Sequence, residues 1–191
     1  MGLLKDMKGL SVVVTTLIIL VVSVLLATVV TFYAINVVST RVQEESLHLS
    51  KQRVWYNTTG GWAEAALLII NTGGRDVVLD KIAVRGQDSP WSNVYYWRTN
   101  TITISADLNV TRVEIPNMDA TMWKETFTYL PDGESFQQAT TDLTLKSGWS
   151  IVIYIMSPDS IALNDVGLSV GITVFTSNAQ YYVETNIAAA Q

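Results

Sequence analysis

The stretch that decides the fold is "KGLSVVVTTLIILVVSVLLATVVTFYAINVVST", residues 8–40. It carries no charged side chain from Gly9 to Thr40, and only hydroxyl residues and one asparagine interrupt the apolar run from Leu10 to Val38. This composition is typical of a membrane-spanning helix. At 1.5 Å per residue the run makes a helix of roughly 43 Å, which is longer than the roughly 30 Å hydrocarbon layer of a bilayer.

The charges on either side of the run predict its orientation. Lys5 and Lys8 precede it, whereas Glu44 and Glu45 follow it beside Arg41. The positive-inside rule therefore places the N-terminus in the cytoplasm and the chain after about residue 40 outside. A cleaved secretory signal has an apolar region of about 7 to 15 residues and a small-residue cleavage site, and this stretch matches neither feature.

The absence of helix breakers predicts that the helix continues beyond the apolar run. No glycine or proline occurs between Gly9 and Gly60, so we expect one helix over residues 10–53, through the polar segment "STRVQEESLHLSKQR". In an apolar medium the backbone must bond to itself, and this requirement overrides the modest helix propensity of valine, isoleucine and threonine. We expect the hydroxyl groups in the run to bond to carbonyls four residues earlier, at Thr15, Thr16, Ser23, Thr28 and Thr31.

After "NTTGG", residues 57–61, the pattern changes to short β-rich runs separated by turn residues. "NTGG", residues 71–74, lies between two of the clearest runs and has the residues that a tight reversal needs. We predict an α+β chain in which one long N-terminal hydrophobic helix is followed by an all-β, immunoglobulin-like sandwich over residues 54–191. The expected strands cover 62–70, 77–84, 94–97, 101–104, 108–115, 122–129, 136–145, 150–156, 166–176 and 181–187.

Composition argues against several classes of function. The formal charge of -5 and the scattered lysines and arginines argue against a nucleic-acid groove. There is no cysteine and His48 is the only histidine. The chain therefore has few of the residues that histidine-based catalytic triads and His/Cys metal sites need. We expect no enzyme activity, no cofactor and no metal site, although a calcium ion held by scattered turn carboxylates stays open.

The junction Lys8, Gly9, Leu10 and Ser11 followed by an apolar helix resembles the class III signal of archaeal type IV pilins and archaellins. This resemblance implies that a dedicated prepilin peptidase cuts between Gly9 and Leu10, which makes residues 1–9 a cytoplasmic leader. It also implies that the helix spans the membrane in the precursor and forms the filament core after assembly. The segments "LLIINTGGRDVVLDKIAV" and "LKSGWSIVIYI" look like strand-turn segments that recur in archaeal pilin domains.

Two departures distinguish the chain from bacterial pilins. Val14 occupies the fifth mature position, where bacterial pilins usually carry a glutamate, and no glycine or proline interrupts the helix. The missing glutamate favours the archaeal branch, and the absence of glycine and proline predicts a continuous helix. The expected assembly surface runs along the helix at Val14, Leu17, Ile18, Val21, Leu25, Val29 and Phe32.

The apolar run from Leu10 to Val38 contains 22 apolar side chains, whose exposure to water would cost more than roughly 30 kcal/mol. Packing between copies of the helix replaces lipid contacts, so lateral packing decides assembly.

Two further patterns concern the outer domain. Asn57 and Asn109 begin N-x-[ST] acceptor patterns, whose asparagines must be exposed to carry a glycan. In "WSNVYYWR", residues 91–98, the aromatic rings either form an adhesive surface or fill the sandwich core or a subunit interface. Strand alternation predicts that Tyr95 and Trp97 point to one face and Tyr96 to the other.

Together these observations predict a structural subunit of an extracellular type IV pilus-like filament, most consistent with an adhesion pilus. The expected partners are further copies in a helical homopolymer, the prepilin peptidase, the membrane assembly machinery and, in the precursor, the membrane, but no nucleic acid. An archaellin of a swimming filament is one alternative. A monomeric, membrane-anchored surface protein that binds a ligand through its β domain is another.

Overall fold

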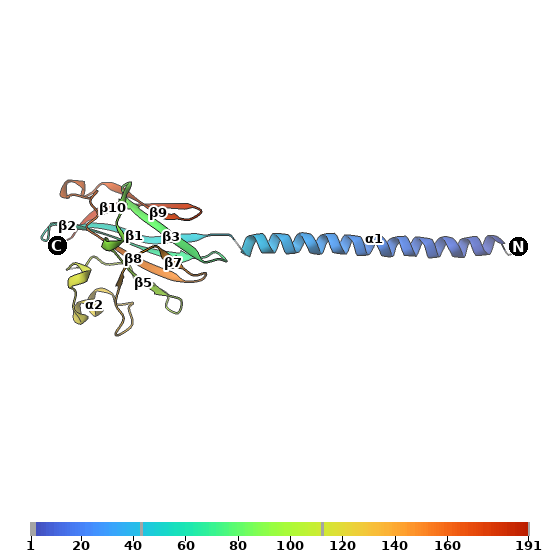
Figure 1. The fold of residues 1–191 in the computed structure, drawn as a ribbon, viewed down its shortest axis with the longest axis horizontal. Helices are drawn as coiled ribbons and strands as arrows, with labels where there is room; N and C mark the ends of the chain where they lie inside the picture. The colour runs from blue at the N-terminus through green and yellow to red at the C-terminus, as the bar shows by residue number, and fades with distance from the viewer. Residues whose placement is uncertain (1–2, 43, 112, 191) are drawn as a thin grey trace. The chain divides into compact units, whose positions relative to one another are not determined.

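The computed structural model describes residues 3–42, 44–111 and 113–190. The chain divides into two compact units, Met1–Gln43 and Glu44–Gln191. The first contains the helix α1 and the second contains the β-sheet, as the ribbon in Figure 1 shows for each unit. The predicted α+β class, with one long apolar helix at the N-terminus and a β domain after it, is confirmed.

Helix α1 runs without interruption over Leu3–Val42. The predicted extension to residue 53 is wrong, because residues from Leu47 onward form strand β1, Leu47–Asn57. This strand has hydrogen-bonded neighbours on both sides, β2 and β10, and it buries Leu47, Val54 and Trp55. The absence of breakers permits a helix, but pairing and burial in the β domain stabilise the strand, and tertiary packing outweighs local propensity.

The strands form one ten-stranded mixed sheet within the described residues. Its path is β4-β3-β9-β10-β1-β2-β8-β5-β6, with β7 paired to β3 outside this path. Short 3-10 turns and the helix α2 interrupt the strands. The bounds are β2 Trp62–Asn71, β3 Val77–Val84, β4 Gln87–Ser89, η1 Trp91–Asn93, β5 Val94–Thr99, η2 Ile115–Asn117, α2 Ala120–Thr126, β6 Gln137–Gln138, β7 Leu143–Leu145, β8 Ser150–Met156, η3 Leu163–Asp165, β9 Ser169–Thr176 and β10 Gln180–Ala190.

Strand β10 turns the expected sandwich into one curled sheet. Its residues 180–186 pair antiparallel with β9, and its residues 187–190 pair parallel with β1. A single long strand therefore joins the two halves of the sheet, which are β4-β3-β9 with β7 on one side and β1-β2-β8-β5-β6 on the other. The halves curl toward each other as a half-barrel. The inner faces of both halves share a core that includes Leu67 and Ile153 from one half and Leu79 and Ile172 from the other.

A second core lies on the outer face of β2 and β8. Alternation along β2 sends Ala65 and Leu67 to the inner core and Ala66 and Leu68 to the outer one. The long segment between β5 and β6 covers this outer face with side chains that include Leu108 and Phe127. Because both faces of β2 and β8 are covered, both strands are apolar at nearly every position.

The covering segment is where the strand predictions fail. The strands expected at 101–104, 108–115 and 122–129 are absent among the residues described there, and the last region forms α2. Asp119 caps this helix, since its Oδ1 accepts hydrogen bonds from the backbone N–H groups of Thr121 and Met122, each at 2.9 Å. The apolar residues of the covering segment pack against a sheet face instead of pairing with a strand. Sequence periodicity does not distinguish these two cases.

Most other strand predictions are confirmed. Those at 62–70, 77–84, 94–97, 150–156 and 181–187 each lie within a strand, and the one at 166–176 begins with a turn before β9. The region 136–145 is split into β6 and β7. The predicted alternation on β5 also holds, because Tyr95 and Trp97 lie in the second core and Tyr96 packs against the first.

Candidate functional site

Between Leu10 and Val38, apolar side chains lie on every side of α1. Its large apolar side chains from Leu10 to Val38 are between 42% and 71% exposed. The predicted assembly residues Val14, Leu17, Ile18, Val21, Leu25, Val29 and Phe32 are all among them. Their helical spacing places them on one stripe, and Val12, Ile19 and Leu26 expose similar area elsewhere on the helix. A helix that is apolar all round is stable only in lipid or within a larger apolar assembly.

Most polar side chains of the span bond to the helix itself. The hydroxyls of Thr15, Ser23, Thr28 and Thr31 donate to carbonyls four residues earlier at 2.7–2.8 Å, as predicted. Thr16 differs, because its hydroxyl donates to the carbonyl of Val13, three residues earlier. These bonds remove free donors from the helix surface, which makes the span suitable for an apolar environment. The uncharged segment Gly9–Thr40 is long and apolar enough to cross a membrane.

The predicted processing junction lies inside α1. Gly9 and Leu10 are both helical, and the side chain of Lys8 lies outside the described residues. A Cβ atom added to Gly9 would meet no atom within 4 Å. Packing and backbone geometry in the described structure therefore do not require a glycine at this position.

The two N-x-[ST] patterns differ in accessibility. Asn57 is only 5% exposed, and its Oδ1 accepts hydrogen bonds from the backbone N–H groups of Thr59 and Gly60 at 3.0 and 2.7 Å. The expectation that both acceptors are exposed is therefore wrong for Asn57, which stabilises the turn before β2. Asn109 is exposed, although Thr111 of the same pattern is only 1% exposed.

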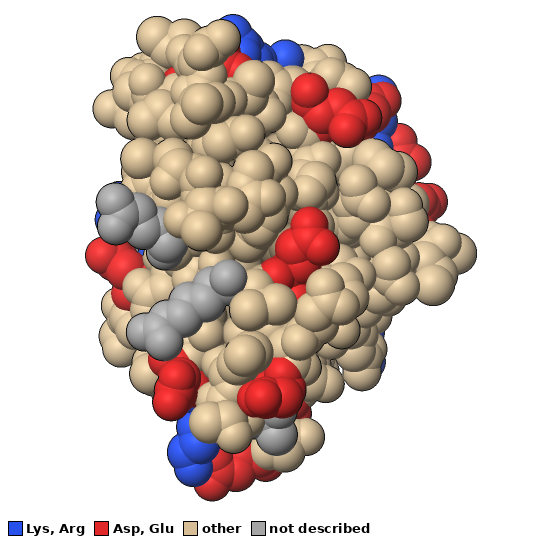
Figure 2. All heavy atoms as spheres, turned by 90° about the vertical axis from the view of Figure 1, so that its left-hand side faces the viewer, with Lys and Arg blue, Asp and Glu red and all other residues tan. Residues whose placement is uncertain are grey.

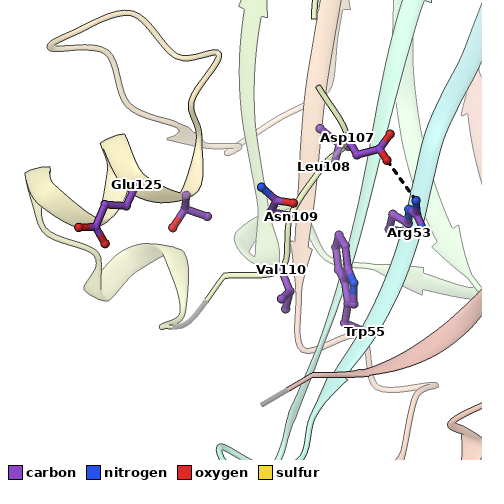
Figure 3. A pocket seen from close by; sticks show the side chains of 8 residues that line it. Arg53, Trp55, Asp107, Leu108, Asn109, Val110 and Glu125 are labelled. Carbon is purple, nitrogen blue, oxygen red and sulfur yellow. Dashed lines mark hydrogen bonds and ion pairs between the residues drawn. The ribbon is translucent and has the colours of Figure 1, made fainter. Parts of the chain in front are cut away.

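A surface pocket of about 460 Å³ lies beside Asn109. In Figure 3, Arg53 and Asp107 point toward each other at one end, Trp55 stands between them and Val110, and Glu125 on α2 lies across the opening. Arg53 Nη2 and Asp107 Oδ2 are 3.5 Å apart. An indole beside an ion pair, a carboxamide and a further carboxylate fits a small polar ligand with one apolar face.

Sequence reasoning missed this pocket because it assigned both of its sides wrongly. Arg53 was expected at the end of the helix, and residues 107–110 were expected next to or within a strand. The signal that could have found β1 is the run "RVWYN", residues 53–57, in which three consecutive β-favouring side chains come just before the turn at residues 57–61.

A buried polar cluster that includes Glu64, Thr111 and Tyr154 lies against the second core. Glu64 on β2 is fully buried, and its Oε2 accepts hydrogen bonds from the backbone N–H and the hydroxyl of Thr111, each at 3.0 Å. The hydroxyl of Tyr154 donates to the carbonyl of Asn109 at 2.9 Å. Burial raises the pKa of Glu64 to about 8, against a smaller lowering by the bonds from Thr111.

Sequence reasoning also missed Glu64, because it placed the acidic residues singly in turns. A lone glutamate inside the otherwise apolar strand "WAEAALLII", residues 62–70, is the signal that could have marked it. Charged residues are almost never fully buried without a specific role or partner.

The charge distribution fits the low pI of the chain. The face in Figure 2 carries separate groups of Asp and Glu with few Lys or Arg. Within the residues that the structure describes, no group of three or more His, Cys, Asp or Glu is arranged to hold a metal ion. His48 is exposed on β1.

Comparisons with known proteins add little to this geometry. No protein-family model and no curated protein matches the chain. A solved structure of the copper-bound PCuAC domain from PmoF2 is similar over 77% of this chain and 99% of that chain, with a TM-score of 0.34 and 14% sequence identity. A likeness at this level carries no argument about fold or ligand.

Proposed function

We propose that this protein is a structural subunit of an extracellular type IV pilus-like filament, which polymerises through α1 and serves in adhesion. The observation that carries the proposal is the exposed apolar surface of α1 between Gly9 and Thr40. Neither core of the β domain includes a residue of this helix among those described. A helix surface that is apolar all round is stable only in lipid or within a larger apolar assembly.

The length of the helix favours a filament over a simple anchor. The uncharged segment Gly9–Thr40 has 32 residues, whereas about 20 suffice to span a bilayer. Packing against copies of the same helix provides an apolar environment along the whole segment. Because lipid and neighbouring helices are about equally apolar, transfer from membrane to filament costs little, and close packing between helices determines the gain.

Gly9 is the second support for the proposal. A glycine inside a helix costs roughly 0.5–1 kcal/mol relative to alanine. The open space around Gly9 gives no packing reason for this cost. A processing enzyme that needs close approach to the backbone between Gly9 and Leu10 supplies one.

The decisive experiment combines N-terminal mass spectrometry with imaging of native material. We expect a mature chain that begins at Leu10 and sediments as filaments. The variant Gly9→Val should retain Met1 and form no filaments. The matched control Ala27→Val adds the same kind of bulk inside the apolar span and should be processed normally.

Two outcomes would refute the proposal. One is a native protein that consists of single molecules with an intact N-terminus. The other is normal filaments from Gly9→Val.

The β-domain pocket favours a second candidate, a membrane-anchored surface protein that binds a small polar ligand. Its ion pair between Arg53 and Asp107, with Trp55 beside it, is an arrangement suited to recognition. This candidate predicts that the protein stays monomeric in the membrane and that Asp107→Asn alters ligand binding. An archaellin shares the assembly plan of the first proposal, and a swimming assay of cells that lack the protein separates these two filaments.

A further inference from the structure

The buried carboxyl group of Glu64 lies where a long covering segment meets the sheet. Glu64 points to the second core, on the same face of β2 as Ala66 and Leu68. Its partner Thr111 belongs to the segment between β5 and β6, and both hydrogen bonds from Thr111 end on one oxygen of the carboxyl group. Glu64 therefore connects this segment to β2 through a single titratable group.

The other carboxyl oxygen has no hydrogen-bond partner in the part of the chain that the structure describes. Among the described residues, Glu64 Oε1 and the Tyr129 hydroxyl are the buried side-chain oxygens without a hydrogen bond. A protonated carboxyl group suits this arrangement, because its carbonyl oxygen can accept both bonds from Thr111 while the proton stays on Oε1. An ionised group would leave a charged oxygen without a partner in an aromatic core, which is strongly unfavourable.

Among the described residues, the groups around Glu64 do not compensate a negative charge. Trp55 on β1 and Met156 on β8 are in register with it, and neither ionises. The described titratable side chains that interact with it are Tyr129 and Tyr154, and burial raises the pKa of each phenol further above 10. Both therefore stay neutral between pH 5 and pH 8, and they cannot supply a positive charge at any pH.

We propose that Glu64 is a pH-sensitive latch, which holds the segment around Thr111 on β2 while its carboxyl group is protonated and releases this segment when the group ionises. Release lets water reach the carboxylate. It also frees Asn109 and Thr111 from their contacts and uncovers the second core beneath them. The proposal is independent of filament assembly, because it concerns the β domain alone.

The direction of the pH effect follows from proton linkage. Burial raises the pKa of Glu64 from 4.5 to about 8, so the open or unfolded state loses the proton first as pH rises. The closed state is then fully favoured below about pH 4.5, and its advantage falls tenfold for each pH unit until about pH 8. Over the whole interval the closing equilibrium constant is expected to fall about 3,000-fold.

The test is urea unfolding of the full-length protein in detergent, followed by tryptophan fluorescence at each pH from 5 to 9. For the wild type we expect the unfolding midpoint to fall steadily toward pH 8. Glu64→Gln keeps the shape of a neutral acid and should give a midpoint that is independent of pH over this range. The control Glu184→Gln removes an exposed carboxyl group and should follow the wild-type profile. An equally steep profile for Glu64→Gln, or a flat one for the wild type, would overturn the proposal.

A second measurement needs no substitution, so it stands even if Glu64→Gln does not fold. Hydrogen exchange at the backbone N–H of Thr111 reports directly on the latch. We expect its protection factor to fall as pH rises from 6 to 8, while that of Ile153 on β8 falls less. A Thr111 protection factor that stays constant over this range would also overturn the proposal.

Discussion

Removal of residues 1–43 tests whether the β domain folds without α1 and whether association depends on α1. Both cores are built from residues at or beyond Leu47, and no described α1 residue belongs to either. A chain that begins at Glu44 should therefore keep the free energy of unfolding of the β domain to within about 0.5 kcal/mol, which is the usual range for changes away from a core. A domain of this size is expected to have a total of about 5–15 kcal/mol.

The same truncation should abolish association. The large apolar side chains of α1 are each worth about 1.5 kcal/mol or more on leaving water, which together exceeds roughly 30 kcal/mol. Without them we expect a soluble monomer in analytical ultracentrifugation and one cooperative transition in calorimetry. A control that lacks only residues 2–9 should still assemble. Filaments from residues 44–191 alone, or an unfolded product, would refute the division of roles.

Three shorter predictions follow from particular residues. Leu25→Asp, midway along the Gly9–Thr40 span, places a charge that costs about 3 kcal/mol in an apolar environment. Electron microscopy should show no filaments for it, and normal ones for Leu25→Ile. Gly73→Ala puts a Cβ atom 2.6 Å from the Glu44 carbonyl oxygen and 2.7 Å from the Ser46 nitrogen, so chemical denaturation should show a loss of about 1–3 kcal/mol. Peptide mass spectrometry should find any N-linked glycan on Asn109 and none on the buried Asn57.

The local sequence pattern predicted the helices and strands that have the same kind of surroundings along their whole length. The span from Gly9 to Thr40 has no charge and no breaker, and such a segment is helical whatever it packs against, because its backbone must bond to itself. Strands β2, β3 and β8 were also predictable, because each is a β-rich run between turn residues. The hydroxyl bonds of Thr15, Ser23, Thr28 and Thr31 follow from the helix alone.

Only the tertiary structure decided the elements whose partners are distant in sequence. Strand β1 reads as a helix extension until β2 and β10 are placed beside it, and the segment between β5 and β6 reads as strands until the outer face of β2 and β8 is seen beneath it. Glu64, Thr111 and Tyr154 are brought together by the same long-range packing. Sequence periodicity records which side chains are apolar, but burial, register and pKa depend on neighbours that only the folded chain supplies.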